Sequence, residues 1–198
     1  LADGSRIELN TSTVLRTDIT ANHRKVTLLR GEAYFQIKHD AAHPFTVETG
    51  GHRITDLGTK FLVRSDADRI EVSLIEGKAQ FDFSNKGVPT HPAILMPGDV
   101  AVATPSALSV MRKSPVAISD ELGWRRGVLI FDRTTLADVA AEVNRYSSKK
   151  LIVTDPRAAR LTIGGTFPAR SVRTIAEAAQ DFYGLHFEDR GTEIVISR

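Results

Sequence analysis

The sequence predicts a mostly β protein that ends in a small α+β domain. Apolar and polar residues alternate over the first 112 positions, as strands with one buried face require. Part of that region also repeats. After the polar stretch KSPVAISDELG, the alternation gives way to helical spacing mixed with short strands. We therefore expect a β-rich domain over residues 1–112, a linker over 113–123 and a βαβ-type α+β domain over 124–198.

The repeat relates VTLLRGEAYFQI, which begins at Val26, to VSLIEGKAQFDF, which begins at Val72. Apolar residues match at alternate positions, and Gly31 matches Gly77 where a turn or bulge is expected. One such unit cannot bury its apolar face alone. Repeated units, with further strands at SRIELN, PFTVE, GHRITDLGTKFLV and DVAVAT, predict a β-solenoid-like or sandwich-like module.

Two helices are expected in the second domain. Thr135 is a candidate N-cap of the first helix. Ser171 is a candidate cap of the second, whose apolar stripe runs to Phe182 and which ends at Gly184. Short strands on either side of both helices predict two βα(β) units.

The composition excludes several classes of function. A net charge of +2 without a basic stripe argues against nucleic acid as a partner, and the absence of cysteine excludes disulfides. The longest apolar stretch is broken by Pro97 and Gly98, so no transmembrane helix is expected. The chain begins at Leu1 without a signal peptide, and we expect a fragment of a longer protein.

Motifs of conventional enzymes are absent, including GxSxG, the P-loop, GxGxxG and HExxH. We therefore expect no turnover of an external substrate and no cofactor. His39 and His43 have the spacing of a helical metal pair, but Pro44 argues for a loop. No metal site is expected.

Gly58 and Thr59 stand together in ITDLGTKFLV, which otherwise has the pattern of a strand. One interpretation is structural, because glycine inside a strand marks a bulge, a bend or a close approach of backbones. The other is chemical, because the threonine hydroxyl can attack the preceding carbonyl carbon if strain brings the two together. The attack needs a base, and Asp56, His52 and Lys60 are near in number only. The sequence leaves both interpretations open.

Several of these segments come in the order typical of one family. LADGSRIELN, GEAYFQI, HPFTVET, DLGTKFLV, VSLIEGKAQF and GDV follow one another as in FecR-type anti-sigma regulators. WRRGVLIFDRTTLADVAAEVNRYSSKKLIV, IGGTF and GTEIVIS resemble the C-terminal part of that family, which is related to the STN domain of secretins and TonB-dependent receptors. The resemblance covers the whole chain.

The resemblance implies the periplasmic part of a single-pass inner-membrane protein that controls an extracytoplasmic-function sigma factor. The implied partner is the N-terminal signalling domain of a TonB-dependent outer-membrane receptor, in siderophore or iron uptake, and iron would enter only through that partner. The sigma factor and the membrane would be reached through a cytoplasmic domain and a helix that these residues do not include. Signal transfer would license intramembrane proteolysis and release the sigma factor.

The resemblance also bears on single residues. Some members of the family cleave themselves by an N-to-O acyl shift at a Gly-Thr bond, which matches Gly58 and Thr59. For partner binding we single out Trp124, Arg125 and Leu129, because tryptophan and arginine are enriched in interface hot spots. The alternative is a core tryptophan that seals the linker against the second domain.

Two other functions stay open at this stage. A β module joined to an STN-like domain is also suited to an envelope or secretion-system adaptor that has no sigma factor. An enzyme or sugar-binding β module is the other, and it would need carboxylates or aromatic rings clustered in one groove.

Overall fold

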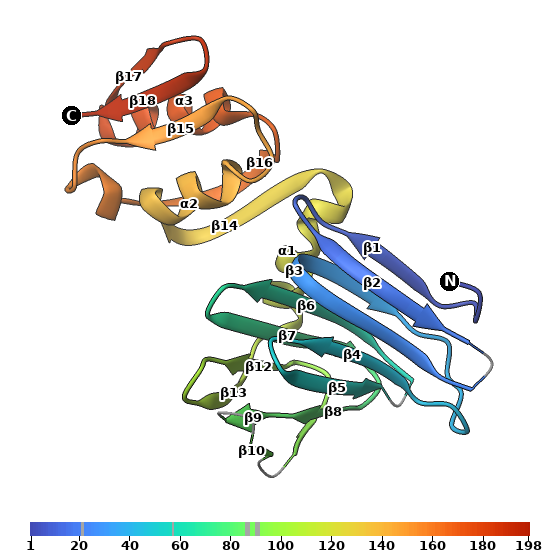
Figure 1. Cartoon of the computed structure of the whole chain (residues 1–198). Helices are drawn as coiled ribbons and strands as arrows, with labels where there is room; N and C mark the ends of the chain where they lie inside the picture. The colour runs from blue at the N-terminus through green and yellow to red at the C-terminus, as the bar shows by residue number, and fades with distance from the viewer. Residues whose placement is uncertain (21, 57, 86–87, 90–91) are drawn as a thin grey trace. The chain divides into compact units, whose positions relative to one another are not determined.

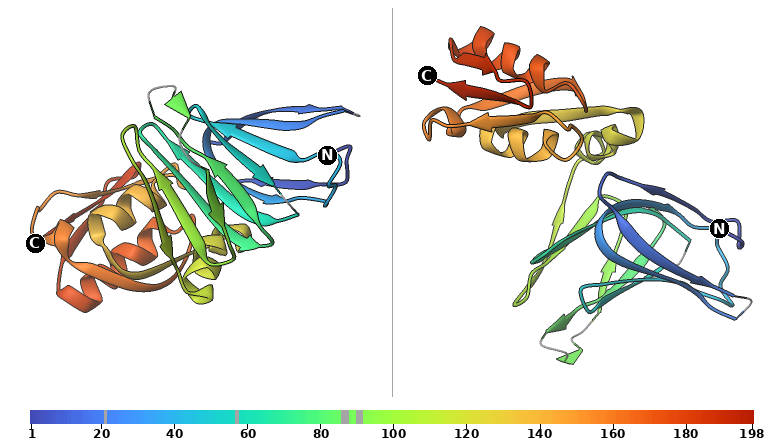
Figure 2. Two further views of the ribbon diagram at one scale, coloured as in Figure 1. Left: turned by 90° about the horizontal axis from the view of Figure 1, so that it is seen from below. Right: turned by 45° about the horizontal axis from the view of Figure 1, so that its top comes forward.

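A curved β-sheet makes up most of the first part of the protein. The computed structural model describes residues 1–20, 22–56, 58–85, 88–89 and 92–198, which fold as two units, Leu1–Ile118 and Ser119–Arg198. Eleven of the described strands of the first unit join in one sheet that curls around its apolar face (Figures 1 and 2). These strands are β1 (Arg6–Leu9), β2 (Val14–Ile19), β3 (Arg24–Gln36), β4 (Phe45–Thr49), β5 (His52–Asp56), β6 (Lys60–Asp66), β7 (Arg69–Glu76), β8 (Ala79–Asp82), β11 (Ala93–Leu95), β12 (Asp99–Ala103) and β13 (Leu108–Arg112).

The core of this unit lies inside the curl. Alternate residues of the strands point inward, as in β4, where Phe45, Val47 and Thr49 are all buried. At the centre, the rings of Phe35 and Phe61 stack with their centroids 4.8 Å apart. The alternation that predicted these strands therefore also identifies the buried face.

The sheet bends at Gly31, in the middle of β3. Residues 24–30 of this strand pair with β2 and β4, whereas residues 31–36 pair with β1 and β6. Gly31 has a φ of +92°, and a Cβ built on it would lie 2.6 Å from the Cα of Thr13. Glycine is required here because the backbone turns a corner directly against another segment.

The repeat predicted from the sequence is present, and it extends further than the matched letters. Leu15 pairs with Leu28 in β2–β3, and Phe61 pairs with Leu74 in β6–β7. Each member of the second pair lies 46 residues after its counterpart in the first, which is also the separation of Val26 and Val72. The two ladders therefore have the same register. Both ladders also shift register just before these pairs. β1 and β5 complete the two repeats in the same way: β1 pairs with the end of β3, and β5 pairs with β8.

Two expectations for this region need correction. The segment 51–63 was predicted as one strand, but β5 ends at Asp56 and β6 begins at Lys60; Leu57 lies outside the described residues. The β-solenoid is not confirmed either. Most of the described pairs in the sheet are antiparallel, with β3–β4 parallel, so the units share one curled sheet. A separate short pair joins β9 (Ser84–Asn85) to β10 (Val88–Pro89).

The predicted linker, residues 113–123, contains helix α1 (Pro115–Glu121) and the start of the 3-10 turn η1 (Leu122–Arg126). In the second unit, β14 (Val128–Thr135) pairs with β16 (Thr162–Pro168), and β15 (Lys150–Val153), β18 (Glu193–Ser197) and β17 (His186–Asp189) form a second sheet in that order. Helices α2 (Leu136–Val143) and α3 (Val172–Tyr183) contact strands of both sheets (Figure 1). The prediction of a mostly β chain with an α+β part is confirmed at this level.

The helix ends agree with the sequence in part. Thr135 caps α2, since its Oγ accepts a hydrogen bond from the Asp138 N–H at 3.2 Å, and Gly184 ends α3 with a φ of +64°. Ser171 precedes α3 but bonds the Thr174 hydroxyl instead of a backbone N–H. Phe182 was placed in the buried stripe, yet it is 70% exposed because the helix reaches past its core at that point. None of the described helices is long and apolar enough to cross a bilayer.

The corner at Gly31 generates a stability prediction. Gly31→Ala should destabilise the first unit by the cost of a left-handed alanine, about 1–2 kcal/mol, plus about 1–3 kcal/mol for the collision with Thr13. Gly51→Ala is the matched control, because Gly51 also has a positive φ, +81°, but no atom within 4 Å of its Cβ position. Scanning calorimetry of both variants should show the larger fall in Tm for Gly31→Ala; equal falls would contradict the steric argument.

Candidate functional site

The Gly58–Thr59 peptide lies in the tight connection between β5 and β6. Thr59 is only 3% exposed, and its carbonyl accepts a hydrogen bond from the Ile37 N–H at 3.0 Å. Gly58 has a φ of +98°, in the region that favours glycine. The pair is therefore part of a buried turn, held from the side by the segment that follows β3.

A buried carboxylate contacts the threonine hydroxyl. The Thr59 Oγ–H donates a hydrogen bond to Asp56 Oδ1, and the Gly58 N–H also bonds this carboxyl group. Asp56 is 4% exposed, and burial raises its pKa above the usual aspartate value. The hydrogen bonds from Thr59 and Gly58 and the charges of Arg24 and His39 oppose that rise in pKa without cancelling it.

Close packing surrounds the Gly58 carbonyl. A Cβ built on Gly77 would lie 2.1 Å from the Gly58 oxygen, and one built on Gly58 would lie 2.7 Å from His39 Nδ1. A side chain at position 77 would therefore collide with backbone, whereas at position 58 the positive φ is the main reason for glycine. A surface pocket of about 310 Å³ reaches the peptide, and its lining comprises Gln36, Ile37, His39, Gly58, Thr59, Lys60 and Glu76.

The first repeat contains a second copy of this turn. Thr13 stands 46 residues before Thr59, and the residue before it, Ser12, also has a positive φ, +57°. Gly31 packs on Thr13 as Gly77 packs on Thr59. The hydroxyl groups differ, however. Thr13 Oγ donates to the Glu32 carbonyl at 2.9 Å and accepts from the Glu32 N–H at 3.0 Å, so its partners are backbone groups.

This arrangement allows one kind of chemistry at Gly58–Thr59. The Thr59 hydroxyl is hydrogen-bonded to a carboxylate that can accept its proton, and a pocket gives water access to the Gly58–Thr59 peptide. The sequence pointed to Gly58 and Thr59, and it left Asp56, His52 and Lys60 as neighbours in number only. The structure brings Asp56 into the site, places Lys60 at the pocket with its Nζ 2.9 Å from Glu76, and leaves His52 outside it.

Sequence reasoning missed two contributors to this site. His39 belongs to the loop after β3, and Gly77 separates β7 from β8. A signal for Gly77 was available, because it is one of the two repeated glycines. No local pattern brings His39 to Gly58, since the contact depends on how the sheet curls.

The three predicted partner-binding residues lie near the start of the second unit. Trp124 belongs to η1 and packs against the core of that unit. Its Nε1–H is buried and has no hydrogen-bond partner among the described residues, which costs about 1–3 kcal/mol. Arg125 is exposed, whereas Leu129 is buried in the core. Arg125 is therefore the most exposed of the three, and Trp124 is partly buried.

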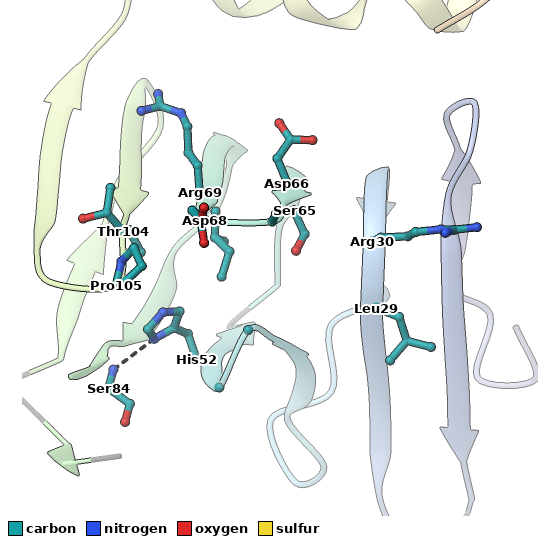
Figure 3. Close-up of a pocket in the computed structure, with 15 residues that line it drawn as sticks. Leu29, Arg30, His52, Ser65, Asp66, Asp68, Arg69, Ser84, Thr104 and Pro105 are labelled. Atoms are coloured by element: carbon teal, nitrogen blue, oxygen red, sulfur yellow. Dashed lines mark hydrogen bonds between the residues drawn. The ribbon is translucent and has the colours of Figure 1, made fainter. Parts of the chain in front are cut away.

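A second hollow surrounds His52 in the first unit (Figure 3). It has a volume of about 550 Å³, and its lining includes Arg30 of β3 and three charged residues of the β6–β7 hairpin, Asp66, Asp68 and Arg69. His52 itself is a structural residue. Its Nδ1 accepts a hydrogen bond from the Ser84 N–H at 3.0 Å, and its ring stacks on Phe83. Across the described part of the chain, no three His, Cys, Asp or Glu residues gather where they could hold a metal ion.

His52 generates a prediction of pH dependence. Burial lowers its pKa below the ordinary value of 6.5, so the folded state binds fewer protons than the unfolded state. The stabilising effect of neutral His52 is full above pH 6.5 and is lost as the pH falls below it. In His52→Asn, whose amide oxygen can still accept from Ser84, urea unfolding from pH 8 to pH 5.5 should show a smaller loss of stability. Parallel curves for the two proteins would refute this role.

The chain is similar to known proteins in both sequence and fold. Residues 1–80, which include Gly58 and Thr59, match the family model described as FecR protein. No curated protein matches the sequence. Two crystal structures of a "putative anti-sigma factor" from Parabacteroides distasonis ATCC 8503, at 1.65 and 2.50 Å resolution, superpose with TM-scores of 0.79 and 0.78. Each is 24% identical, and each match covers all of this chain and 92% of the solved one. The first 80 residues thus match the FecR family, and the whole chain shares the fold of these proteins.

Proposed function

We propose that this chain is the periplasmic, signal-transducing part of a FecR-type anti-sigma regulator anchored in the inner membrane by a single helix. The observation that carries the proposal is the FecR match over residues 1–80 within a fold that a solved protein described as an anti-sigma factor shares along the entire chain. The FecR match and the shared fold support a regulatory role and not catalytic turnover. The membrane helix and the sigma-binding domain would precede Leu1 in the longer protein.

In this proposal the second unit, as an STN-like domain, receives the signal. Its partner would be the N-terminal signalling domain of a TonB-dependent receptor, which would connect the regulator to siderophore and iron uptake. The strands offer a physical route for binding. β15 and β17 are the two edges of their sheet, and an edge strand can accept a strand of another protein through backbone hydrogen bonds.

The first unit, in the same proposal, processes itself at Gly58–Thr59. Thr59 Oγ attacks the Gly58 carbonyl carbon, the peptide becomes an ester, and water then releases residues 1–58 from residues 59–198. The fold is compatible with a cut at this turn, because hydrogen-bonded strands would still hold the two pieces together. The ladders β3–β6 and β5–β8 both run between one piece and the other. The processed protein would remain one assembly.

The adaptor without a sigma factor is the competing function, and a sigma-dependent reporter separates the two. The full-length protein should repress transcription by its cognate sigma factor, and the receptor's signalling domain should change that repression. An adaptor would leave the reporter unchanged.

Self-processing predicts a simple mass spectrum. The purified chain should consist of two fragments that separate in denaturant, with the junction between Gly58 and Thr59, whereas Thr59→Ala should stay whole because the nucleophile is gone. Thr13→Ala is the matched control, since it removes the equivalent hydroxyl of the first repeat. It should still be cleaved. A whole wild-type chain would leave Gly58–Thr59 with a structural role only.

If the receptor's signalling domain binds at Arg125, substitution of this residue should lower its affinity for the chain. Arg125→Ala should weaken binding of the receptor's signalling domain at least tenfold, about 1.4 kcal/mol, if Arg125 is an interface hot spot. Arg133→Ala serves as the control, because Arg133 is 88% exposed at the bulge of β14 in the same unit. Titration calorimetry measures both variants, and equal affinities would exclude Arg125 from the interface.

A further inference from the structure

We infer that Asp56 is the proton carrier of the self-cleavage proposed above: it takes the proton from Thr59 Oγ and delivers it to the Thr59 nitrogen. The inference rests on that proposed reaction, and it assigns a catalytic role to a residue three positions before the nucleophile.

The contact between the two side chains is direct. Thr59 Oγ–H donates to Asp56 Oδ1, and a hydroxyl has only one proton to donate. The same carboxyl group accepts a hydrogen bond from the Gly58 N–H, so it contacts both residues of the peptide that is cleaved. Asp56 is the last residue of β5, and its backbone is fixed by pairing with Phe45 and Ala79 on either side. The carboxylate is therefore held in place by two ladders.

The proton balance of the reaction needs such a group. As the bond from Thr59 Oγ to the Gly58 carbon forms, the hydroxyl proton moves to the Asp56 carboxylate. As the bond from the Gly58 carbon to the Thr59 nitrogen breaks, that nitrogen takes a proton from Asp56 and leaves as an amine. Water then adds across the ester, which restores the Thr59 hydroxyl and gives the Gly58 carboxylic acid, whose proton passes to the new Thr59 amine. Asp56 ends in its starting state, and no other reactant is required.

Other groups around the pocket are less suited to this step. Lys60 is an ammonium paired with Glu76 at 2.9 Å, and an ammonium has no lone pair with which to accept a proton. His39 lies against Gly58, but the hydrogen bond of the hydroxyl runs to Asp56. Burial also raises the pKa of Asp56, which makes its carboxylate a stronger base than an exposed aspartate.

The first repeat shows the same turn without this chemistry. Thr13 Oγ donates to a backbone carbonyl, which is not a base, and its oxygen accepts from the Glu32 N–H. At the repeat separation of 46 residues, the counterpart of Asp56 is Asn10, a buried amide whose Nδ2–H donates to Glu32 Oε2 at 2.8 Å. The carboxylate is thus a difference between two otherwise similar turns.

The test compares rates of cleavage. The chain is made by cell-free synthesis, and intact mass follows the appearance of fragments 1–58 and 59–198 in the wild type, Asp56→Asn and Thr13→Ala. Asparagine keeps an acceptor for the hydroxyl but cannot take its proton, so cleavage of Asp56→Asn should be at least about 100-fold slower. Thr13→Ala should cleave within a few-fold of the wild type. Circular dichroism checks that all three fold.

The outcomes separate the two proposals. If the wild type stays whole, self-cleavage itself fails. If the wild type and Asp56→Asn cleave at the same rate, self-cleavage stands and the role of Asp56 is overturned.

Hydroxylamine, which attacks esters, shows whether Asp56 acts in the acyl shift that forms the ester. Asp56→Asn should remain whole in hydroxylamine, because no ester forms; rapid cutting between Gly58 and Thr59 would show that the acyl shift does not need Asp56.

A measurement on the wild type covers the case in which Asp56→Asn does not fold. Its cleavage rate should fall as the pH drops through the raised pKa of Asp56, because only the carboxylate accepts a proton. The charges of Arg24 and His39 both act on the Asp56 carboxyl group, and His39→Gln removes the second of them while leaving the carboxylate in place. The acid limb should therefore persist in His39→Gln. Its disappearance in that variant, or a flat profile in the wild type, would overturn the assignment.

Discussion

The packing of one backbone segment against a glycine at each corner of the sheet is the constraint on which the rest of the first unit depends. Gly31 and Gly77 both adopt a positive φ, and each leaves room for the turn that precedes the neighbouring strand. A side chain at either position would push that turn away from the sheet. The curl, the buried face and the position of Thr59 all follow from this close approach.

The same constraint explains why the candidate site is buried although it lies in a turn. Turns usually lie at the surface because their polar groups need water. Here the surrounding segments satisfy those groups, since Asp56 bonds the Gly58 N–H and the Thr59 hydroxyl, and Ile37 bonds the Thr59 carbonyl. Removal from water also raises the pKa of Asp56. The burial of the turn and the raised pKa of Asp56 therefore share one cause.

Local patterns predicted much of the fold, and what they missed depends on contacts between distant segments. Period-two alternation identified the strands of the first unit, and the Thr135 cap and Gly184 stop bounded two helices. The break of 51–63 into β5 and β6 was missed because both sides of Gly58 have strand-forming sequence, and a glycine there is as consistent with a bulge in one strand as with a bend between two. Phe182 was misplaced because helical spacing says where a side chain points but not where the core ends. Gly58 and Thr59 were found by residue type, whereas Asp56 could be chosen among its neighbours only with the geometry in hand.

The two ladders with a common register have a consequence for how the chain folds. Tandem units of similar design can exchange partners during folding, so that β2 finds β7, or β6 finds the first half of β3, and the chain is trapped in a mispaired state. The copies differ in ways that discourage such exchange: the connection between β1 and β2 is one residue longer than that between β5 and β6, and Gly31 continues a strand where Gly77 divides two. Divergence between the copies thus favours the correct pairing of strands during folding.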